Sequence, residues 1–382
     1  MTRKLVTVRK VAAAHPIKGA DRIEAVEVDG WTCIAGTGQF KAGDLAVFFE
    51  IDSFLPASDP RWTYLADKFI TYNGERGFRV KSAQIRGQIS QGILEPLDDF
   101  PEILAAWVDL EIRHGRREAE RLIRETAFEG LLGVKKFEAT ATAAPKTSEP
   151  AHKSDQIPMP GFIPRTDQER VQNLPDVFEK WGDEIFQETV KMDGSSMTVY
   201  FVRNDSPLMD KLAPLGTGGK QTAAQPNGRV GVCSRNVEKP ESQGGYFWTS
   251  AKENALPEKL SQLNRNIALQ GELCGSSIQK NFEGFPLGFH DFFVFAAWDI
   301  DERRYMKPKE TEELVGHLGL KHVPSVGYHR LGDIARNVQE ILARAEGIGI
   351  NGKKREGIVL KHVDGRFSFK AISNSYLLKH GE

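Results

Sequence analysis

The chain has 382 residues, of which 40% are hydrophobic, 27% charged and 9% aromatic, and its formal net charge at pH 7 is -1. This length suits about two domains with separate cores. The near-neutral charge excludes nucleic-acid binding through a global basic field, so any such contact must come from local patches.

The sequence also argues against a membrane or secreted protein and against a protein built on disulfides or zinc. The longest apolar runs are too short to cross a bilayer and the N-terminus lacks the apolar core of a signal peptide, so we expect a cytoplasmic protein with no membrane partner. The three cysteines, Cys33, Cys233 and Cys274, are scattered and lack CxxC spacing. We therefore expect reduced cysteines, without a disulfide framework or a zinc site.

Short β-prone segments separated by turns fill residues 1 to about 100. Ile23–Val28 and residues 31–34 flank a turn at Asp29-Gly30, and the apolar run 45–49 indicates a buried strand. Such a series predicts a small OB-like β-barrel, which we assign to residues 1–115. A purely structural barrel fits the pattern as well as a nucleic-acid platform does. The first candidates for nucleic-acid contact are Arg76, Arg79, Lys81 and Arg86.

Residues 116–159 are expected to connect two domains. Apolar residues at helical spacing predict a helix over 116–132, and residues 139–158, rich in Ala, Thr, Pro and Ser, have the composition of a linker. The second domain then spans 160–382 and begins with a helix near 176–181. Within it, the polar stretch 203–228 predicts a long loop inserted in a hairpin, whose role stays open.

The second domain is organised around Lys191. An apolar, β-prone segment leads into Lys191, and Asp193-Gly194 then turns the chain into another predicted strand. A lysine amine that loses its proton through burial or nearby cations can attack a nucleotide α-phosphate. The alternative is a surface lysine in a β-hairpin.

Six further polar or aromatic residues follow at or near the ends of predicted strands. They are, in chain order, Arg235, Glu272, Phe295, Glu356, Lys361 and Lys370. Taken singly, each fits a solvated surface group or a core aromatic. Their order and chemical types together favour a functional site, and the guanidinium of Arg235 suits a phosphate.

These segments resemble, in order, nucleotidyltransferase motifs I, Ia, III, IIIa, IV and V of the ATP-dependent nucleic-acid ligases and mRNA capping enzymes. The run Ser277-Ile278-Gln279-Lys280-Asn281 looks most like the RNA ligases, and an N-terminal OB-like module is similar to the Deinococcus-type RNA ligase family. The resemblance covers residues 188–372. It implies an α+β protein in which the OB-like barrel precedes an ATP-grasp-like nucleotidyltransferase domain of antiparallel sheets with flanking helices.

The resemblance implies an ATP-dependent RNA ligase that joins a 3′-hydroxyl to a 5′-phosphate. Its expected partner is RNA or an RNA/DNA duplex with a nick, with RNA on the 3′-hydroxyl side, and no oligomer is implied. Lys191 would accept AMP from ATP, while Lys361 and Lys370 would neutralise phosphate charge as further catalytic residues. ATP and Mg²⁺ or Mn²⁺ are the expected cofactors.

The other residues of the motifs receive binding roles from the same resemblance. Phe295 would stack on adenine, and Arg235 would hold the 5′-phosphate of the polynucleotide. Gly194 belongs to the nucleotide-binding turn. Three carboxylates, those of Asp193, Glu272 and Glu356, would contact the nucleotide and bind the metal ion directly or orient its waters. Glu272 has the ribose of the nucleotide as an alternative contact.

Two departures from the family pattern bear on this reading. Only twelve residues follow Lys370, so we expect no C-terminal OB domain of the kind found in DNA ligases and capping enzymes. RNA ligases carry a second lysine in motif V, separated from the first by one intervening residue, but here Ser368 and Ile372 hold those positions. The second cation is left open, with Lys379 or a residue of 351–355 as possibilities.

Three alternatives remain at this point. A DNA ligase would use the same motifs, and a capping-type guanylyltransferase would prefer GTP to ATP. A catalytically silent RNA-binding protein would use the barrel and basic surfaces alone.

Overall fold

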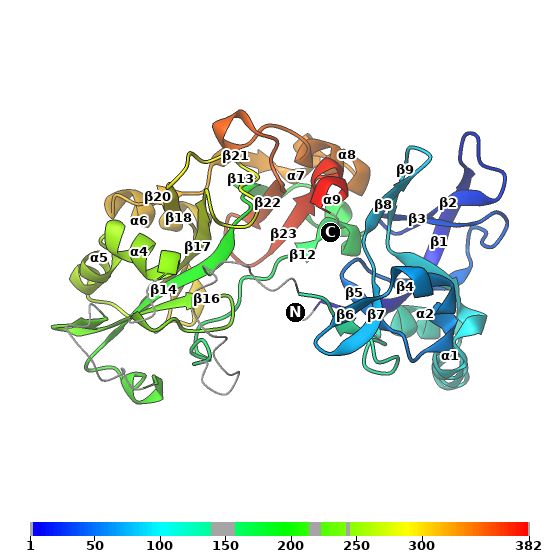
Figure 1. The fold of residues 1–382 in the computed structure, drawn as a ribbon, viewed down its shortest axis with the longest axis horizontal. Helices are drawn as coiled ribbons and strands as arrows, with labels where there is room; N and C mark the ends of the chain where they lie inside the picture. Colours follow the sequence, from blue (N-terminus) through cyan, green and yellow to red (C-terminus); the bar gives the residue numbers. More distant parts are fainter. Residues whose placement is uncertain (1–2, 139–156, 214–222, 242–244, 381–382) are drawn as a thin grey trace.

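The computed structural model describes residues 3–138, 157–213, 223–241 and 245–380. Figure 1 shows two bodies side by side, with the N-terminal domain in blue and cyan and the second domain in green to red. Residues 139–156 of the predicted linker and residues 214–222 of the predicted 203–228 loop lie outside the described residues. Among the described residues, no helix is long and apolar enough to cross a membrane.

The N-terminal domain is built from curled antiparallel sheets. One sheet has the order β10-β4-β1-β2-β3, a second has the order β11-β5-β7-β6, and β8 and β9 form a hairpin. The strands are β1 Val6–Pro16, β2 Ile23–Val28, β3 Trp31–Gly36, β4 Leu45–Phe49, β5 Ser53–Pro56, β6 Ile70–Tyr72, β7 Glu75–Arg79, β8 Ser82–Ile85, β9 Gln88–Gln91, β10 Ile93–Pro96 and β11 Lys135–Lys136. The hairpin predicted around Asp29-Gly30 is formed by β2 and β3.

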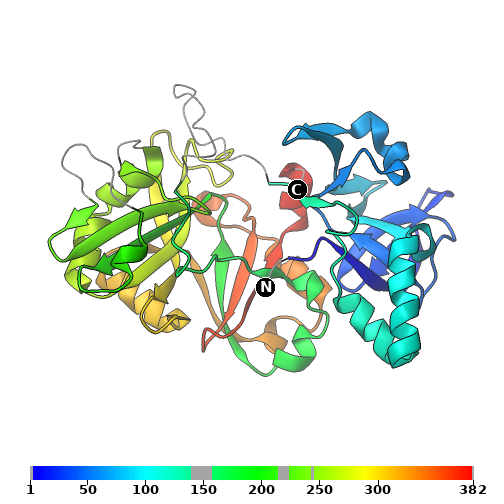
Figure 2. The same ribbon diagram turned by 90° about the horizontal axis from the view of Figure 1, so that it is seen from below.

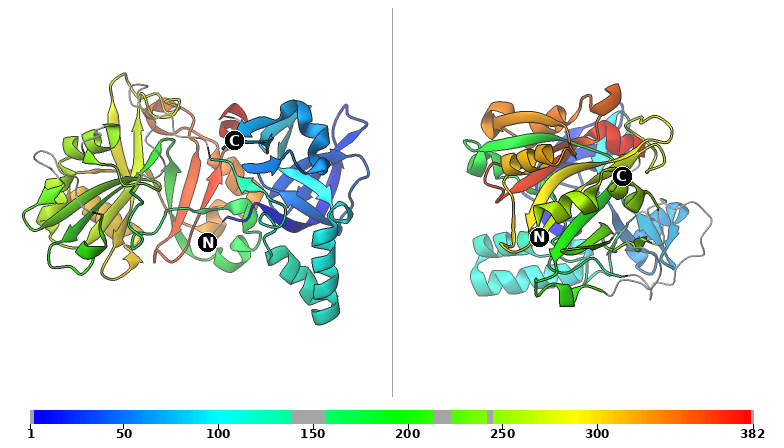
Figure 3. Two further views of the ribbon diagram at one scale, coloured as in Figure 1. Left: turned by 60° about the horizontal axis from the view of Figure 1, so that its bottom comes forward. Right: turned by 90° about the vertical axis from the view of Figure 1, so that its left-hand side faces the viewer.

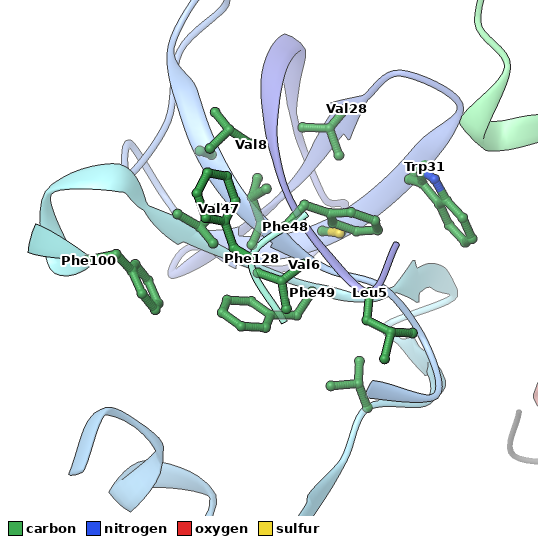
Figure 4. Close-up of a cluster of buried hydrophobic side chains, with 14 of the residues drawn as sticks. Leu5, Val6, Val8, Val28, Trp31, Val47, Phe48, Phe49, Phe100 and Phe128 are labelled. Carbon is green, nitrogen blue, oxygen red and sulfur yellow. The ribbon is translucent and has the colours of Figure 1, made fainter. Parts of the chain in front are cut away.

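Apolar side chains of these strands fill one core. Val6 and Val8 of β1 lie opposite Phe49 and Val47 of β4, and all four are fully buried. Trp31, Phe48 and Phe100 close this core, as the close-up in Figure 4 shows. The cluster supplies the burial that lets this domain keep its own fold.

Two helices, α1 (Pro101–His114) and α2 (Arg116–Glu125), pack beside each other on one side of the barrel (Figure 3). Ala119 and Ile123 of α2 are fully buried in the barrel core. The helix that we expected to connect the domains therefore covers the first domain. The exact domain boundaries stay a prediction.

The second domain consists of two sheets with helices on their outer faces (Figures 1 and 2). The five-stranded sheet has the order β12-β23-β22-β13-β21, and the seven-stranded sheet has the order β15-β16-β14-β17-β18-β19 with β20 beside β18. The strands of the first are β12 Glu169–Arg170, β13 Ile185–Lys191, β21 Ser325–Arg330, β22 Gly357–His362 and β23 Ser368–Ile372. Those of the second are β14 Ser195–Arg203, β15 Ala224–Gln225, β16 Gly228–Ser234, β17 Ile267–Gly275, β18 His290–Asp299, β19 Arg304–Tyr305 and β20 Lys321–His322.

Each sheet buries its outer face under helices. The five-stranded sheet packs on α7 (Leu331–Ile334) and α8 (Val338–Ala345), with Phe186, Ile358 and Leu360 in the shared core. The seven-stranded sheet packs on α4 (Gly245–Glu253), α5 (Leu256–Leu263) and α6 (Pro308–His317). A smaller apolar cluster that includes Val190, Met192 and Phe293 lies between the sheets. The remaining helices are α3 Val177–Trp181 and α9 Asn374–His380. The predicted α+β architecture is confirmed.

The strands on either side of Lys191 do not form a hairpin. β13 belongs to the five-stranded sheet and β14 to the seven-stranded sheet, so the chain crosses from one sheet to the other at residues 192–194. The hairpin alternative for Lys191 is wrong, because each strand finds its partners elsewhere: β13 pairs with β21 and β22, and β14 pairs with β16 and β17. Lys191 thus lies where the two sheets meet.

The domains are joined by polar contacts and by the C-terminal helix. Asn173 accepts hydrogen bonds from Arg9 and Trp31 of the barrel, at 2.8 and 2.9 Å, and donates one to Glu50 at 3.0 Å. Tyr376 and Leu377 of α9 are buried in the same apolar cluster as the barrel core. Figure 1 shows α9, in red, between the two domains. The barrel is therefore packed against the strands that carry the site.

Candidate active site

Lys191 lies among carboxylates. Its Nζ is 2.6 Å from Oε1 of Glu356, and the lysine side chain is 25% exposed while that of Glu356 is 8% exposed. Burial alone would lower the pKa of Lys191, but the carboxylates of Glu356, Glu272 and Asp193 outweigh it and raise the pKa above the ordinary lysine value. This corrects the expectation that burial or cations favour a neutral amine: without a ligand, the amine is held protonated.

The carboxylates around Lys191 repel one another in a buried setting. Burial, and then the neighbouring carboxylates, raise the pKa of Glu272 to about 8 despite the charge of Lys191. Burial likewise raises the pKa of Glu356 and raises that of Glu283 to about 8. One amine does not neutralise four acidic groups, so the cluster favours an added cation.

Three cations share the inner face of the five-stranded sheet with Lys191. Lys370 lies opposite Val359, Lys361 lies opposite Gln187, and Gln187 and Lys191 are both on this face because they are an even number of residues apart. Arg170 of the short strand β12 pairs directly with Lys370 in parallel register. Burial, followed by the charges of Arg170, Lys191 and Arg3, lowers the pKa of Lys370 to about 7. A cationic strip thus runs beside Lys191.

Arg170 lies next to Lys370, so we prefer it as the second cation over the candidates that the sequence offered, Lys379 or a residue of 351–355. The choice stays a prediction. Sequence reasoning missed Arg170 because β12 has only two residues and pairs across about 200 positions of chain. Arg3, from the start of the barrel, adds a further cation to the same neighbourhood.

Phe295 is aimed by a β-bulge. Gln270 pairs with Ala296 and Gly271 pairs with Val294, so Phe295 is the extra residue on β18. Lys361 donates a hydrogen bond to the Phe295 carbonyl oxygen, and its Nζ lies 5.2 Å from the ring centroid. Burial lowers the pKa of Lys361 to about 8. The bulge therefore brings an aromatic face and a lysine together.

A cavity of about 100 Å³ opens at this point. Phe295 and Lys361 form part of its wall, Ser368 of β23 adds another part, and residues 165–168 cover it. Segment 165–168 is a second feature that the sequence did not single out. An aromatic side chain beside polar groups in a concave site is the usual setting for a nucleotide base.

Arg235 follows β16 at the rim of this region. Its guanidinium is paired with the carboxylate of Asp167 at 2.6 Å, and both side chains are about half exposed. Arg235 is not among the described residues that line the cavity, whereas Asp167 is. The guanidinium is thus available to a ligand that approaches from solvent.

Asp193 and Gly194 form a turn that neighbouring segments hold on both sides. The Asp193 backbone N–H donates to Oε1 of Glu283 at 3.1 Å, and the Tyr376 hydroxyl donates to Oδ1 of Asp193 at 3.0 Å. Gly194 accepts a hydrogen bond from Gln279 at 3.1 Å. A Cβ on Gly194 would lie 2.7 Å from the Glu272 side chain, so the close approach of this turn to β17 requires glycine.

The donor set suits a hard divalent ion that keeps its water shell. Among the described residues, no three Asp, Glu, His or Cys side chains converge enough to ligate a metal ion directly. The carboxylates Asp193, Glu272, Glu283 and Glu356 nevertheless surround one amine, and Oε2 of buried Glu283 has no hydrogen-bond partner. Hydrated Mg²⁺ or Mn²⁺ matches such outer carboxylates.

The structure brings most of the predicted residues together. Lys191, Asp193, Glu272 and Glu356 interact electrostatically as one cluster, and Lys370 lies beside them. Phe295 and Lys361 form the adjoining cavity, Arg235 stays at the rim, and Gly194 serves the turn. Glu283 and Tyr376 are additional residues that only the fold reveals.

Two family models match the chain. One, described as an OB-fold domain, matches residues 5–97, and the other, described as RNA ligase, matches residues 184–372. Among solved structures, a ligand-free mutant of Naegleria gruberi RNA ligase is 39% identical, with a TM-score of 0.81, and the alignment covers 99% of this chain and 98% of that one. The chain belongs to the RNA ligase family.

Other structures of the same relative agree. A mutant of Naegleria gruberi RNA ligase with ATP and Mn is 38% identical, covers 100% of both chains and has a TM-score of 0.81. Naegleria gruberi RNA ligase with PPi is 40% identical, with 99% of both chains covered and a TM-score of 0.80. No curated protein sequence matches the chain. The predicted membership of the RNA ligases, with an N-terminal OB-fold, is confirmed.

Proposed function

We propose that this protein is an ATP-dependent RNA ligase that seals nicks through a lysyl-AMP intermediate on Lys191. The observation that supports it best is the position of the Lys191 amine, 2.6 Å from Glu356 at the meeting of two sheets, beside a strip of cations and a cavity walled by Phe295. Structures of Naegleria gruberi RNA ligase with ATP and Mn and with AMP and Mn support the choice of nucleotide and metal.

The reaction begins at the nucleotide. ATP places its base against Phe295 and its phosphates along Lys370 and Arg170. The Lys191 amine, after losing a proton, attacks the α-phosphorus; a P–N bond forms, the bond to the β-phosphate oxygen breaks, and pyrophosphate leaves. The cations stabilise the charge that grows on the phosphate oxygens during this step.

Deprotonation of Lys191 depends on its carboxylates. In the ligand-free state they hold the amine protonated, so their charge must be compensated before attack. Asp193, Glu272 and Glu356 would hold hydrated Mg²⁺ or Mn²⁺, which when bound would supply positive charge next to the phosphates. The Tyr376 and Glu283 hydrogen bonds keep Asp193 in position for this role.

AMP then passes to the polynucleotide. An oxygen of the 5′-phosphate, held by Arg235, attacks the phosphorus of lysyl-AMP and returns the electron pair to the Lys191 nitrogen. The 3′-hydroxyl oxygen next attacks that 5′-phosphate and AMP leaves, which closes the strand. The proposed partner is RNA or an RNA/DNA duplex with a 3′-hydroxyl/5′-phosphate nick.

The covalent intermediate gives the direct test. Protein incubated with α-labelled ATP and Mg²⁺ or Mn²⁺ is expected to become labelled, and Lys191→Ala is expected to lose the label while Lys309→Ala, an exposed lysine on α6, keeps it. Labelling that persists in Lys191→Ala would overturn the nucleophile assignment. Preference for GTP would instead indicate a capping-type guanylyltransferase.

The sugar at the nick tests the substrate. Nicked duplexes with ribose or deoxyribose on the 3′-hydroxyl side are expected to be sealed faster with ribose, because polar groups of a site can read the 2′-hydroxyl. Equal rates would favour a DNA ligase.

We also propose a cytoplasmic location, which is supported by three cysteines that are free and buried.

A further inference from the structure

We propose that three exposed lysines beside the catalytic turn, Lys280, Lys353 and Lys379, bind the backbone of the RNA strand that ends in the 3′-hydroxyl. We refer to these residues as the lysine surface. The inference rests on the proposed ligase function and names the place where one of the two strand ends binds.

The loop that carries Lys280 is fixed to the catalytic turn. This loop joins β17 to β18, and it bonds the turn twice, through Gln279 to Gly194 and through Glu283 to Asp193, both at 3.1 Å. Gln279 and Asn281 have φ values of 50° and 48°, in the left-handed region that residues other than glycine seldom adopt. Such strained backbone persists only when its surroundings hold it, so Lys280 has a defined position relative to Lys191.

Lys353 and Lys379 lie against the same loop. The Lys379 Nζ is 5.2 Å from the ring centroid of Phe282, and the Lys353 side chain packs on Gly284, where a Cβ would come within 2.8 Å of the lysine Cε. Burial, and then the charges of Lys280 and Lys379, lower the pKa of His380. Lys280 and Lys379 thus both lie near His380, and Lys353 contacts the same loop at Gly284.

The lysine surface keeps its charge available for an anion. All three lysines are exposed, and none has an ion pair with a carboxylate in the part of the chain that the structure describes. Two partly exposed aromatic rings lie among them, Phe282 and His380, which meet edge-on at 4.9 Å. Cations interleaved with aromatic rings are what nucleic-acid strands bind, through phosphates and stacked bases.

The topology assigns the surface to the 3′-hydroxyl strand. β14, which begins directly after the catalytic turn, lies between β16 and β17 in the sheet. Arg235 follows β16 and the Lys280 loop follows β17, so the two cationic sites flank the turn from opposite sides. A nick likewise has a strand end on each side of the break. Because we assign Arg235 to the strand that begins with the 5′-phosphate, we assign the lysine surface to the strand that ends in the 3′-hydroxyl.

The surface also reaches the barrel. Helix α9, which carries Lys379, contacts β8 of the N-terminal domain, and Gln91 of β9 donates to Asn374 at 3.2 Å (Figure 1). Arg86, at the tip of the β8–β9 hairpin, is exposed. A strand bound across α9 would therefore contact both domains.

The test compares a triple variant, Lys280→Ala with Lys353→Ala and Lys379→Ala, with the wild type. The control triple, Lys259→Ala with Lys309→Ala and Arg336→Ala, removes three cations of the same domain, from α5, from α6 and from the segment between α7 and α8. Two quantities are measured: formation of lysyl-AMP from ATP, and binding of a fluorescent nicked RNA/DNA duplex at several salt concentrations. Lysyl-AMP formation is expected to stay within about twofold of wild type. The slope of log affinity against log salt is expected to fall by about two to three, with about tenfold or greater loss of affinity at low salt.

Truncating one arm of the duplex identifies the strand. Shortening the 3′-hydroxyl strand is expected to weaken binding of the wild type but to change the triple variant little, whereas shortening the 5′-phosphate strand is expected to weaken both. An unchanged salt slope in the variant, or an equal effect of both truncations on the two proteins, would overturn the inference. So would loss of lysyl-AMP in the variant, because the lysines would then act at Lys191. Absence of lysyl-AMP in the wild type would overturn the proposed function, while the salt slope would still decide on the surface.

Discussion

Asp193 illustrates how much of the site depends on residues outside the motifs. Its carboxylate accepts a hydrogen bond from Tyr376, which comes from a helix buried against the barrel. Tyr376→Phe removes only the hydroxyl. We expect lysyl-AMP formation to slow about tenfold and to require more metal ion, since Asp193 loses the contact that orients it.

A matched control separates orientation from stability. Tyr200 donates an equally long, 3.0 Å hydrogen bond to Glu238 within the same domain, but in a different cluster. Tyr200→Phe is expected to cost about 1 kcal/mol of unfolding free energy without raising the metal requirement. If both variants slow labelling equally at saturating metal, the Tyr376 hydroxyl has only a structural role.

Lys370 should make stability depend on pH. Burial and then nearby cations lower its pKa to about 7 in the folded chain, against 10.5 for an ordinary lysine. Between these values the unfolded chain binds more protons, so this residue makes the folded state more stable as pH rises and less stable as pH falls toward 7. The difference in unfolding free energy between Lys370→Met and wild type is therefore expected to shrink from pH 7 toward pH 10.

Urea unfolding across this pH range measures the effect. Lys309→Met, which replaces an exposed lysine on α6, provides the control and is expected to run parallel to wild type. A Lys370→Met curve that also runs parallel to wild type would contradict the lowered pKa.

At the scale of elements, the sequence predicted strands better than it predicted their partners. The predicted segments 23–28 and 31–34 and the apolar run 45–49 correspond to β2, β3 and β4. The same kind of apolar pattern placed Lys191 correctly at a strand end but not at a junction between sheets. Pairing depends on distant residues, which periodicity does not encode.

The same limit explains the residues that the sequence missed. Arg170 reaches Lys370 through a two-residue strand, and Phe295 is turned toward Lys361 by a bulge that shifts register. Neither feature has a local signal of its own. The family resemblance supplied Phe295 and the carboxylates, whereas Arg170, Glu283 and Tyr376 needed the tertiary structure.

At the scale of the whole molecule, the barrel contacts the cations to which we assign the phosphates of ATP. Glu50, a barrel carboxylate only 1% exposed, is 2.6 Å from Arg3 and 3.8 Å from Arg170. Both arginines influence Lys370. Docking of the barrel therefore sets the charge balance next to Lys191, and the first chemical step should be sensitive to the interface between the domains.

Asn173 offers a way to loosen that interface. It links Arg9 and Trp31 to Glu50, and it lies three residues after Arg170. Asn173→Ala leaves the buried Trp31 N–H without its acceptor, so we expect a loss of about 1–3 kcal/mol in unfolding free energy. Hydrogen exchange in β12 should become faster, and lysyl-AMP formation should slow because Arg170 is no longer held beside Lys370.

Asn204→Ala is the control, because the Asn204 side chain donates only to an exposed carbonyl of Pro226. This variant should change neither hydrogen exchange in β12 nor the rate of lysyl-AMP formation. Faster exchange in Asn173→Ala with an unchanged rate of lysyl-AMP formation would show that the second domain adenylylates itself without the barrel, and would restrict the barrel to later steps on RNA.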